Sequence, residues 1–327
     1  MLFLYIFLGV LAVFLIACFV IAKISHNQFF NYHYEADPDI PLYTAEEFNV
    51  SKDKVEFKEG KNTLRGYLYH KGEYDDNKII IYAHGMFSNH NSYLQDICYL
   101  AEKGYLVLGF NYLGVSDSDG KNLKGFGSSI EGVDAAIKYI KSNDELKNKD
   151  IYVVGHSWGG FAACNIVKFH PEIKGIAALA PFVSTYSIVK NTLPKQIRFI
   201  TPMVVLIDDI CCGKYSRCNS IKSLNSYKGK ALLIQSTDDY IIDYNKSGIG
   251  LIKNKTTNKN INYLTEENKG HQPHYTIEGV KLMREFEAKA RTLRGEELKE
   301  YKGQCDFHKM GELDPRVMDK IVEMIEE

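Results

Sequence analysis

Hydrophobic residues follow a changing pattern along the chain, and each pattern predicts a different kind of element. An uncharged apolar run extends from Met1 to Ala22, about the length of a helix that spans a bilayer. Residues 55–69 alternate apolar and polar side chains around a turn at Gly60, as an antiparallel hairpin at a sheet edge does. Short continuous apolar runs then alternate with segments of helical spacing. The chain therefore predicts an α/β fold, with a mostly parallel sheet covered by helices on both faces.

These patterns divide the chain into an apolar N-terminal segment, residues 1–22, a connector, residues 23–50, and a globular domain, residues 51–327. The connector mixes aromatic, acidic and proline residues without a period. Within the domain, residues 183–230 are too long for a simple crossover between two strands, and we interpret them as an inserted helical lid. Residues 294–313 carry no pattern that assigns them a structure.

The N-terminal run favours an uncleaved membrane anchor. No basic segment precedes it, it is longer than the apolar part of a signal peptide, and no small-residue cleavage motif follows it. A cleaved signal peptide remains the alternative, and Leu15–Cys18 resembles a lipoprotein box. The side of the membrane stays open, because the chain amine before the run and Lys23 after it nearly cancel.

Charge and cysteine spacing argue against nucleic-acid binding and metal binding. The formal net charge of -1 provides no basic face for nucleic acid. The seven cysteines lack the spacing of a zinc site, so we expect no metal, and only the segment Cys211–Cys218 is suited to a disulfide. The oligomeric state is not determined by these patterns.

Chemically useful residues occur where the predicted strands end. Ser157 follows an apolar strand and precedes an apolar helical segment, and Gly155 and Gly159 beside it permit a sharp turn that exposes the serine. A serine hydroxyl is a weak nucleophile that needs a histidine base, and the base needs an acid to orient it. The later strand ends offer two acids and two histidines: Asp238, Asp239, His271 and His274.

Four motifs, YAHGMFSN, GHSWGG, STDDYIID and GHQP, occur in an order that resembles the α/β-hydrolase superfamily, nearest to bacterial membrane-associated or secreted serine hydrolases of the esterase or S33-peptidase type. The resemblance covers about residues 55–275. It implies a Ser-His-Asp triad and an oxyanion hole of two backbone N–H groups. The implied triad is Ser157, His271 and Asp239, and the implied amides are those of Met86 and Trp158.

The resemblance also orders the alternatives. Asp239 has the family's spacing to the following apolar pair, and His271 follows a glycine as the family's base does. Asp238 and His274 stay open as substitutes. The family's D-x-R-G-x-G-x-S segment reads NYLGVSDS here, so that loop is expected to shape the pocket differently. His84 and His156 are expected to serve packing or hydrogen bonding.

The expected function is cofactor-free hydrolysis of a carboxylic ester, with the anchor and the lid favouring a lipid-like or amphipathic substrate. A peptidase, an amidase or an acyltransferase with the same triad is the alternative, and acidic residues of the lid such as Asp208 and Asp209 would suit a peptide amine. An inactive binding module is a further alternative. Relatives that attack with an aspartate are excluded by the serine at position 157.

Overall fold

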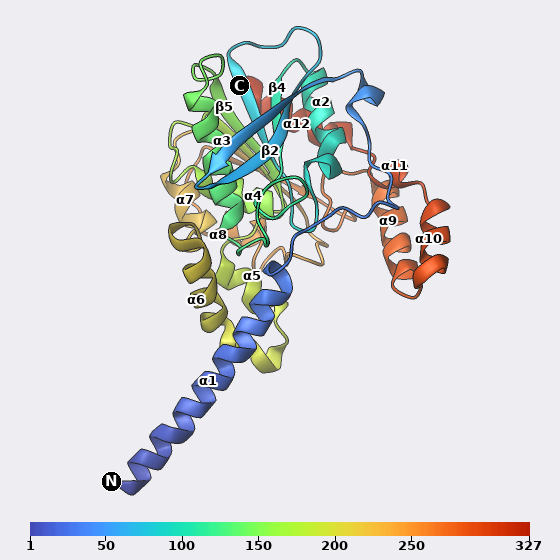
Figure 1. Ribbon diagram of the computed structural model, residues 1–327. Coiled ribbons are helices and arrows are strands. Elements are labelled where there is room, and N and C mark those ends of the chain that lie inside the picture. Colours follow the sequence, from blue (N-terminus) through green and yellow to red (C-terminus); the bar gives the residue numbers. More distant parts are fainter.

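One eight-stranded sheet lies at the centre of the molecule, with the strand order β1-β2-β4-β3-β5-β6-β7-β8 (Figure 1). The computed structural model describes residues 1–327. β1, β2 and β4 are antiparallel neighbours, and every other neighbouring pair is parallel. The strands are β1 (Ser51–Glu59), β2 (Asn62–His70), β3 (Lys78–Ala83), β4 (Leu106–Phe110), β5 (Asp150–His156), β6 (Gly175–Leu179), β7 (Lys230–Ser236) and β8 (Ile261–Glu266).

Helices cover both faces of the sheet and produce two apolar cores. Successive residues of a strand point to opposite faces, so Ile79 and Ile81 of β3 enter one core while Ile80 enters the other. This arrangement explains why the central strands are continuous apolar runs. The first core includes residues of α3 (Ser128–Ser142), α4 (Trp158–Ile166) and α8 (Ile249–Lys255), and the second includes residues of α2 (Leu94–Glu102) and α12 (Pro315–Glu326).

Residues 183–229 form a helical insertion between β6 and β7, which we call the lid. Its elements are α5 (Thr185–Thr192), η3 (Lys195–Ile200), α6 (Thr201–Cys212), η4 (Gly213–Tyr215) and α7 (Ser220–Ser226). α6 lies beside the N-terminal helix (Figure 1). The cysteines of the segment Cys211–Cys218 are free, so the disulfide considered for this segment is absent.

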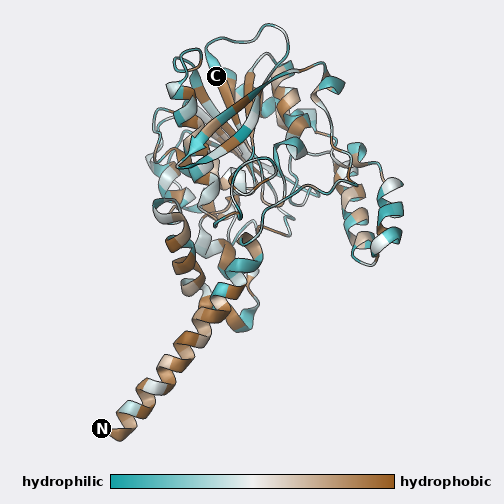
Figure 2. Cartoon of the chain, viewed as in Figure 1, coloured by the Kyte–Doolittle hydropathy of each residue, from teal (hydrophilic) through white to brown (hydrophobic).

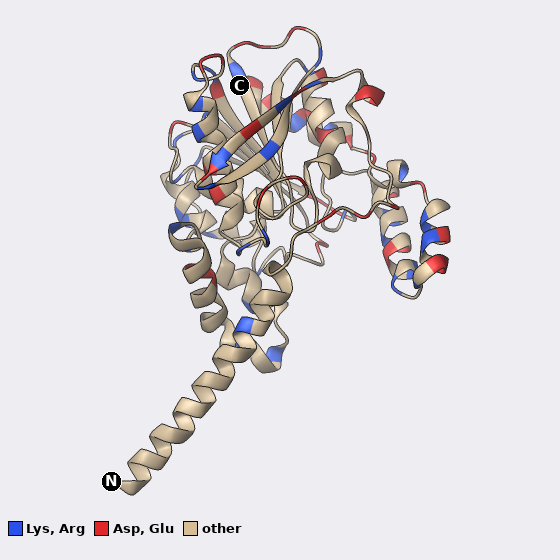
Figure 3. Cartoon of the chain, in the orientation of Figure 1, with Lys and Arg blue, Asp and Glu red and all other residues tan.

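The N-terminal helix α1 (Leu2–Phe30) continues well beyond Ala22. Its first part projects from the domain, is apolar along its whole length (Figure 2) and carries no charged residue (Figure 3). α1 is long and apolar enough to cross a membrane, and little of this apolar part is buried in the protein.

Residues 23–50, the expected connector, have regular structure at both ends. Four buried residues follow one another at intervals of four along α1 and form a narrow stripe against the domain: Cys18, Ala22, His26 and Phe30. Further along, Tyr34 forms a parallel bridge with Val115, and η1 (Ala45–Phe48) places Ala45 in the second core. Residues 23–50 are therefore attached to the domain at several points.

The unassigned residues 294–313 form two short helices, α10 (Gly295–Gly303) and α11 (Phe307–Met310). Together with α9 (Ile277–Ala290) they project from the side of the molecule opposite the lid (Figure 1). Phe286 of α9 packs against Tyr301 and Phe307, which holds this projection together.

Candidate active site

Ser157 occupies a strained turn between β5 and α4. Its backbone angles are φ 56° and ψ -109°, in a region that residues other than glycine rarely adopt. The neighbouring glycines leave room for this turn: a Cβ at Gly159 would lie 1.9 Å from the Ala83 carbonyl oxygen, and one at Gly155 would lie 2.5 Å from the Gly159 oxygen. The turn lifts the serine above the carboxyl ends of the parallel strands, where ligands bind in open α/β sheets.

We expect Gly159→Ala to lower the free energy of unfolding by about 3 kcal/mol, because backbone must move to admit the methyl group. Urea unfolding of the detergent-solubilised protein measures this loss. Gly303→Ala is the matched control, since a Cβ there meets no atom within 4 Å. Its helical position predicts a change of at most about 1 kcal/mol in the stabilising direction. Equal stability of the two variants would contradict the tight turn.

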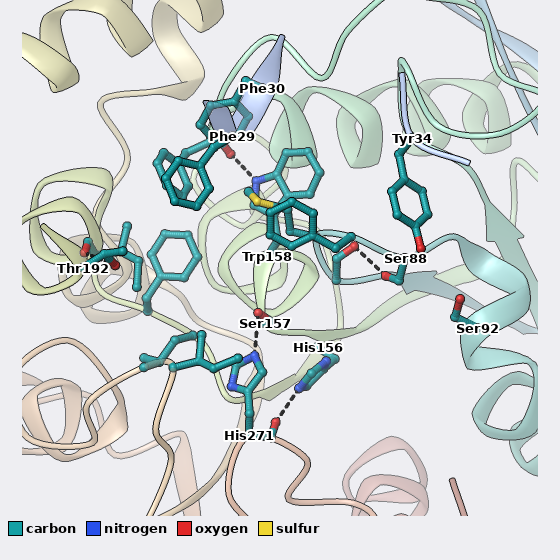
Figure 4. A pocket seen from close by; sticks show the side chains of 18 of the residues that line it. Phe29, Phe30, Tyr34, Ser88, Ser92, His156, Ser157, Trp158, Thr192 and His271 are labelled. Atoms are coloured by element: carbon teal, nitrogen blue, oxygen red, sulfur yellow. Dashed lines mark hydrogen bonds between the residues drawn. The ribbon is translucent and has the colours of Figure 1, made fainter. Parts of the chain in front are cut away.

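Three side chains from three different loops meet at this turn, and Figure 4 shows two of them, Ser157 and His271. The Ser157 hydroxyl lies 2.9 Å from His271 Nε2, and His271 Nδ1 lies 3.0 Å from Asp239 Oδ2 and 3.1 Å from Oδ1. With the Nδ1 proton donated to Asp239, Nε2 is free to accept the serine proton. The structure thus brings together the serine, the histidine and the acid that the resemblance implied.

Asp239 is held as a charged group in a buried position. Burial by itself would raise the pKa of this carboxyl, but the hydrogen bond and charge of His271, with the Ile242 amide and the Gln235 side chain, hold it below its ordinary value. The contacts are specific: Oδ1 accepts from the amides of Ile241 and Ile242 at 2.9 Å each, and Oδ2 accepts from Gln235 Nε2 at 2.9 Å. The carboxylate is therefore fixed in the plane that His271 requires.

The two alternative residues lie elsewhere. Asp238 forms an ion pair with Arg284 at 2.7 Å, and its Oδ1 accepts from the Gly270 amide at 3.2 Å. His274 is fully buried, with its Nε2 3.3 Å from Asp96 Oδ1, and burial lowers its pKa well below the ordinary value. Neither side chain is hydrogen bonded to Ser157 or to His271.

Two further histidines brace the loops around the site. Burial lowers the pKa of His156 to about 3, so this ring is neutral at physiological pH. Its Nε2–H donates to the His271 carbonyl at 2.7 Å, and its Nδ1 accepts from the Tyr93 hydroxyl at 2.8 Å. His84 Nδ1–H donates to the Gly85 carbonyl at 2.7 Å, next to Met86. Both rings thus make the structural hydrogen bonds expected from the sequence.

Met86 and Trp158 line the same cavity as Ser157, and their backbone amides are free. Trp158 is the first residue of α4, where backbone N–H groups have no acceptor within the helix. Neither amide donates to another group of the chain. The Trp158 ring is fixed by its Nε1–H, which donates to the Phe126 carbonyl at 2.7 Å.

The cavity above Ser157 has a volume of about 560 Å³, and 19 of its 30 lining residues are hydrophobic. Its size and lining suit a small-molecule site. The lid supplies several apolar wall residues, among them Ile188, Val189, Leu193 and Val204.

α1 also forms part of this wall, which the residue pattern did not predict, through Ser25, His26, Phe29 and Phe30. Figure 4 shows Phe29 and Phe30 close to Trp158, and the rings of Phe30 and Trp158 have centroids 6.4 Å apart. Ala22, His26 and Phe30 are spaced four residues apart and therefore share one helix face.

Comparison with known proteins agrees with this architecture. A family model described as serine aminopeptidase, S33, matches residues 75–206, which include Ser157 but neither Asp239 nor His271. An uncharacterised protein of Rickettsia prowazekii is 33% identical over 86 residues, which are 26% of this chain and 35% of that protein. The match therefore spans about a third of that relative.

Solved structures resemble most of the domain. An esterase from Pyrococcus furiosus has a TM-score of 0.57 at 20% identity, covering 76% of this chain and 94% of the esterase. Est1E from Butyrivibrio proteoclasticus, solved with ferulic acid bound, has a TM-score of 0.53 at 17% identity, covering 72% of this chain and 98% of that protein. Such likeness at low identity concerns the fold. The chain therefore has the α/β-hydrolase fold.

Proposed function

We propose that this protein is a serine hydrolase that cleaves carboxylic esters with lipid-like or amphipathic acyl groups. One observation carries the proposal: Ser157, His271 and Asp239 form a continuous hydrogen-bonded chain that ends in a largely apolar cavity. The family match to S33 enzymes and the fold of the two esterases support hydrolysis in general.

In this mechanism, Ser157 attacks the ester carbonyl carbon while His271 Nε2 takes the hydroxyl proton. Asp239 stabilises the resulting imidazolium and keeps the ring oriented. The free amides of Met86 and Trp158 donate to the oxyanion of the tetrahedral intermediate, which stabilises it by about 3 kcal/mol or more. His271 then passes its proton to the leaving alkoxide, the alcohol departs, and an acyl-enzyme remains. Water, activated by His271 in the same way, releases the acid and restores Ser157.

Cleavage of an ester is favoured over removal of an N-terminal amino acid by the charges of the cavity. An aminopeptidase needs a free carboxylate for the peptide amine. Asp208 and Asp209 of the lid do not line the cavity: the first accepts from the Phe126 amide and the second pairs with Arg217. Asp37 does line the cavity, but Lys302 already pairs with it.

The proposal includes membrane attachment through residues 1–22. A helix of this length with an uncharged, exposed and uniformly apolar surface is unfavourable in water and favourable in a bilayer. The active site would then lie next to one surface of the membrane.

Labelling with a fluorophosphonate probe tests whether Ser157 is an activated nucleophile. We expect the solubilised wild type to label and Ser157→Ala to remain unlabelled. Ser92→Ala is the matched control, because Ser92 borders the same cavity without touching a histidine, and it should label like the wild type. An unlabelled, folded wild type would contradict the proposed activity.

Hydrolysis rates test the substrate class. Faster turnover of short p-nitrophenyl esters than of long ones would contradict the lipid-like substrate. Cleavage of aminoacyl anilides in preference to esters would favour a peptidase.

A further inference from the structure

One unbroken helix, α1, contains both the apolar run, residues 1–22, and part of the cavity wall. The first cavity residue of α1 is Ser25, three positions after Ala22, which ends the apolar run. At a rise of about 1.5 Å per residue, the cavity wall begins only about 4.5 Å beyond the apolar run. A membrane that holds residues 1–22 therefore reaches almost to the cavity.

The lid runs alongside the same helix. The rings of Phe14 and Phe199 stack with centroids 6.1 Å apart, and further up His26 Nε2 lies 3.5 Å from Asp208 Oδ1. Phe14 lies about 12 Å inside the apolar run, since eight residues separate it from Ala22. The start of α6 and the η3 helix before it thus lie beside the apolar run and not above it (Figure 1).

The outer face of the lid has the composition of a surface that enters a lipid leaflet. Phe199, Leu206 and Ile210 are 59%, 49% and 72% exposed. Between Ser184 and Ile207 the lid carries no acidic residue, and its three charged residues are all basic: Lys190, Lys195 and Arg198. Exposed apolar side chains flanked by long basic ones combine burial among acyl chains with attraction to anionic headgroups.

Apolar and polar residues line different sides of the cavity. Phe29 and Phe30 of α1 lie close to Trp158 (Figure 4). Figure 4 shows Ser88 and Ser92 on the opposite side of Ser157 from Thr192 of the lid. Phe29 and Phe87 are both exposed at the mouth, with ring centroids 6.5 Å apart. An ester with its chain toward α1 would direct its alcohol part toward the serines.

We infer that α1 and the lid connect the cavity directly to the bilayer, and that the substrate is an acyl ester resident in the membrane. Its chain passes from the leaflet along the surface shared by α1 and the lid and reaches Ser157 without crossing bulk water. This inference rests on the proposed function and adds the source of the substrate and the route by which it arrives.

Trp158, the only tryptophan of the chain, reports on this route because it borders the cavity. Its ring packs near Phe30, which is eight residues, or about 12 Å, beyond the apolar run. Bromine atoms quench tryptophan fluorescence only at short range, so brominated chains that stay in the bilayer do not quench the fluorescence of Trp158. A brominated chain that enters the cavity quenches it.

The experiment reconstitutes the full chain with Ser157→Ala, which prevents turnover, into vesicles of phosphatidylglycerol and phosphatidylcholine brominated at mid-chain. We expect strong quenching relative to unbrominated vesicles. Adding Phe199→Glu and Leu206→Glu, which charge the outer face of the lid, should remove most of it. Ile277→Glu is the matched control, because Ile277 is 55% exposed on α9, away from the lid, and it should retain the quenching.

A second readout compares hydrolysis of a long-chain ester dissolved in the vesicles with hydrolysis of p-nitrophenyl butyrate in water, using chains that keep Ser157. The charged lid should lower the first rate at least about tenfold, given the cost of a charge among acyl chains, and leave the second unchanged. Absence of quenching in every variant, or quenching that survives the charged lid, would overturn the inference. A wild type that hydrolyses neither ester refutes the proposed function, whereas the quenching result still decides the route.

Discussion

Replacing His271 with alanine is expected to lower kcat/KM for ester hydrolysis by about 10⁴-fold or more, since no other group can take the Ser157 proton. His271 Nε2 is the only histidine nitrogen within hydrogen-bonding distance of Ser157 Oγ. Steady-state kinetics with a p-nitrophenyl ester measure the loss. The thermal unfolding midpoint should be recorded in parallel, because His271 is buried and its removal also affects packing.

His70→Ala is the control for this variant. His70 lies on β2, at the far edge of the sheet from His271, and its removal should change kcat/KM by no more than about twofold. Activity of His271→Ala within tenfold of the wild type would mean that another base serves Ser157. His274, enclosed beside Asp96, would then be the residue to test next.

Two adjacent aspartates should differ by orders of magnitude in their effect on turnover. Asp239→Asn is expected to lower kcat by about 10³-fold to 10⁴-fold, because a neutral amide neither stabilises the imidazolium nor selects the tautomer with a free Nε2. Asp238→Asn should lower kcat by no more than about twofold, since its partners are Arg284 and the Gly270 amide, and an asparagine oxygen can still accept from that amide. The pair has the same substitution at neighbouring positions, so each variant controls for the other.

The pKa of Asp239 lies below its ordinary value, so this carboxylate is charged throughout the neutral range and the comparison needs no pH adjustment. If Asp238→Asn proved to be the severe variant, the orientation of His271 in solution would differ from the one described. If both variants retained activity, the imidazolium would not depend on either carboxylate.

Much of the fold was predictable because burial on both sides of a parallel strand leaves a continuous apolar run. The segment around Ile80 and the strand before Ser157 are of this kind, and both lie in the middle of the sheet. The position of Ser157 was predictable for a related reason: a tight strand-to-helix turn tolerates only small neighbours, and glycines are visible in a sequence. Residue patterns alone are therefore enough to predict the fold class and the turn that carries Ser157.

Residue type could not decide between Asp238 and Asp239, because both are aspartates at adjacent positions. Spacing in the family favoured Asp239, but the physical reason lies in the fold. The amides of Ile241 and Ile242 and the side chain of Gln235 bind one carboxylate, and Arg284 from a distant helix binds the other. Contacts of this kind depend on tertiary structure.

The buried face of α1 and the helix α10 were not predicted from the sequence, for opposite reasons. In α1 almost every residue up to Ala22 is apolar, so the narrow buried stripe cannot be distinguished from its surroundings, and beyond Ala22 only His26 and Phe30 continue it. In α10 nearly every side chain is exposed and only Lys302 is buried, so no apolar period exists to be recognised. Periodicity reveals a helix only when its buried and exposed faces differ in polarity.

Because α1 is one continuous helix from the apolar run to the cavity wall, it fixes both the distance and the rotation between these two parts. One extra residue between Ala22 and Ser25 would raise the domain by about 1.5 Å and rotate it by about 100° relative to residues 1–22. Such a rotation would carry Phe14 away from Phe199 while leaving every strand of the sheet in place. The length of this short stretch is thus constrained by geometry as strictly as the residues of the cavity are by chemistry, although none of its side chains takes part in the reaction.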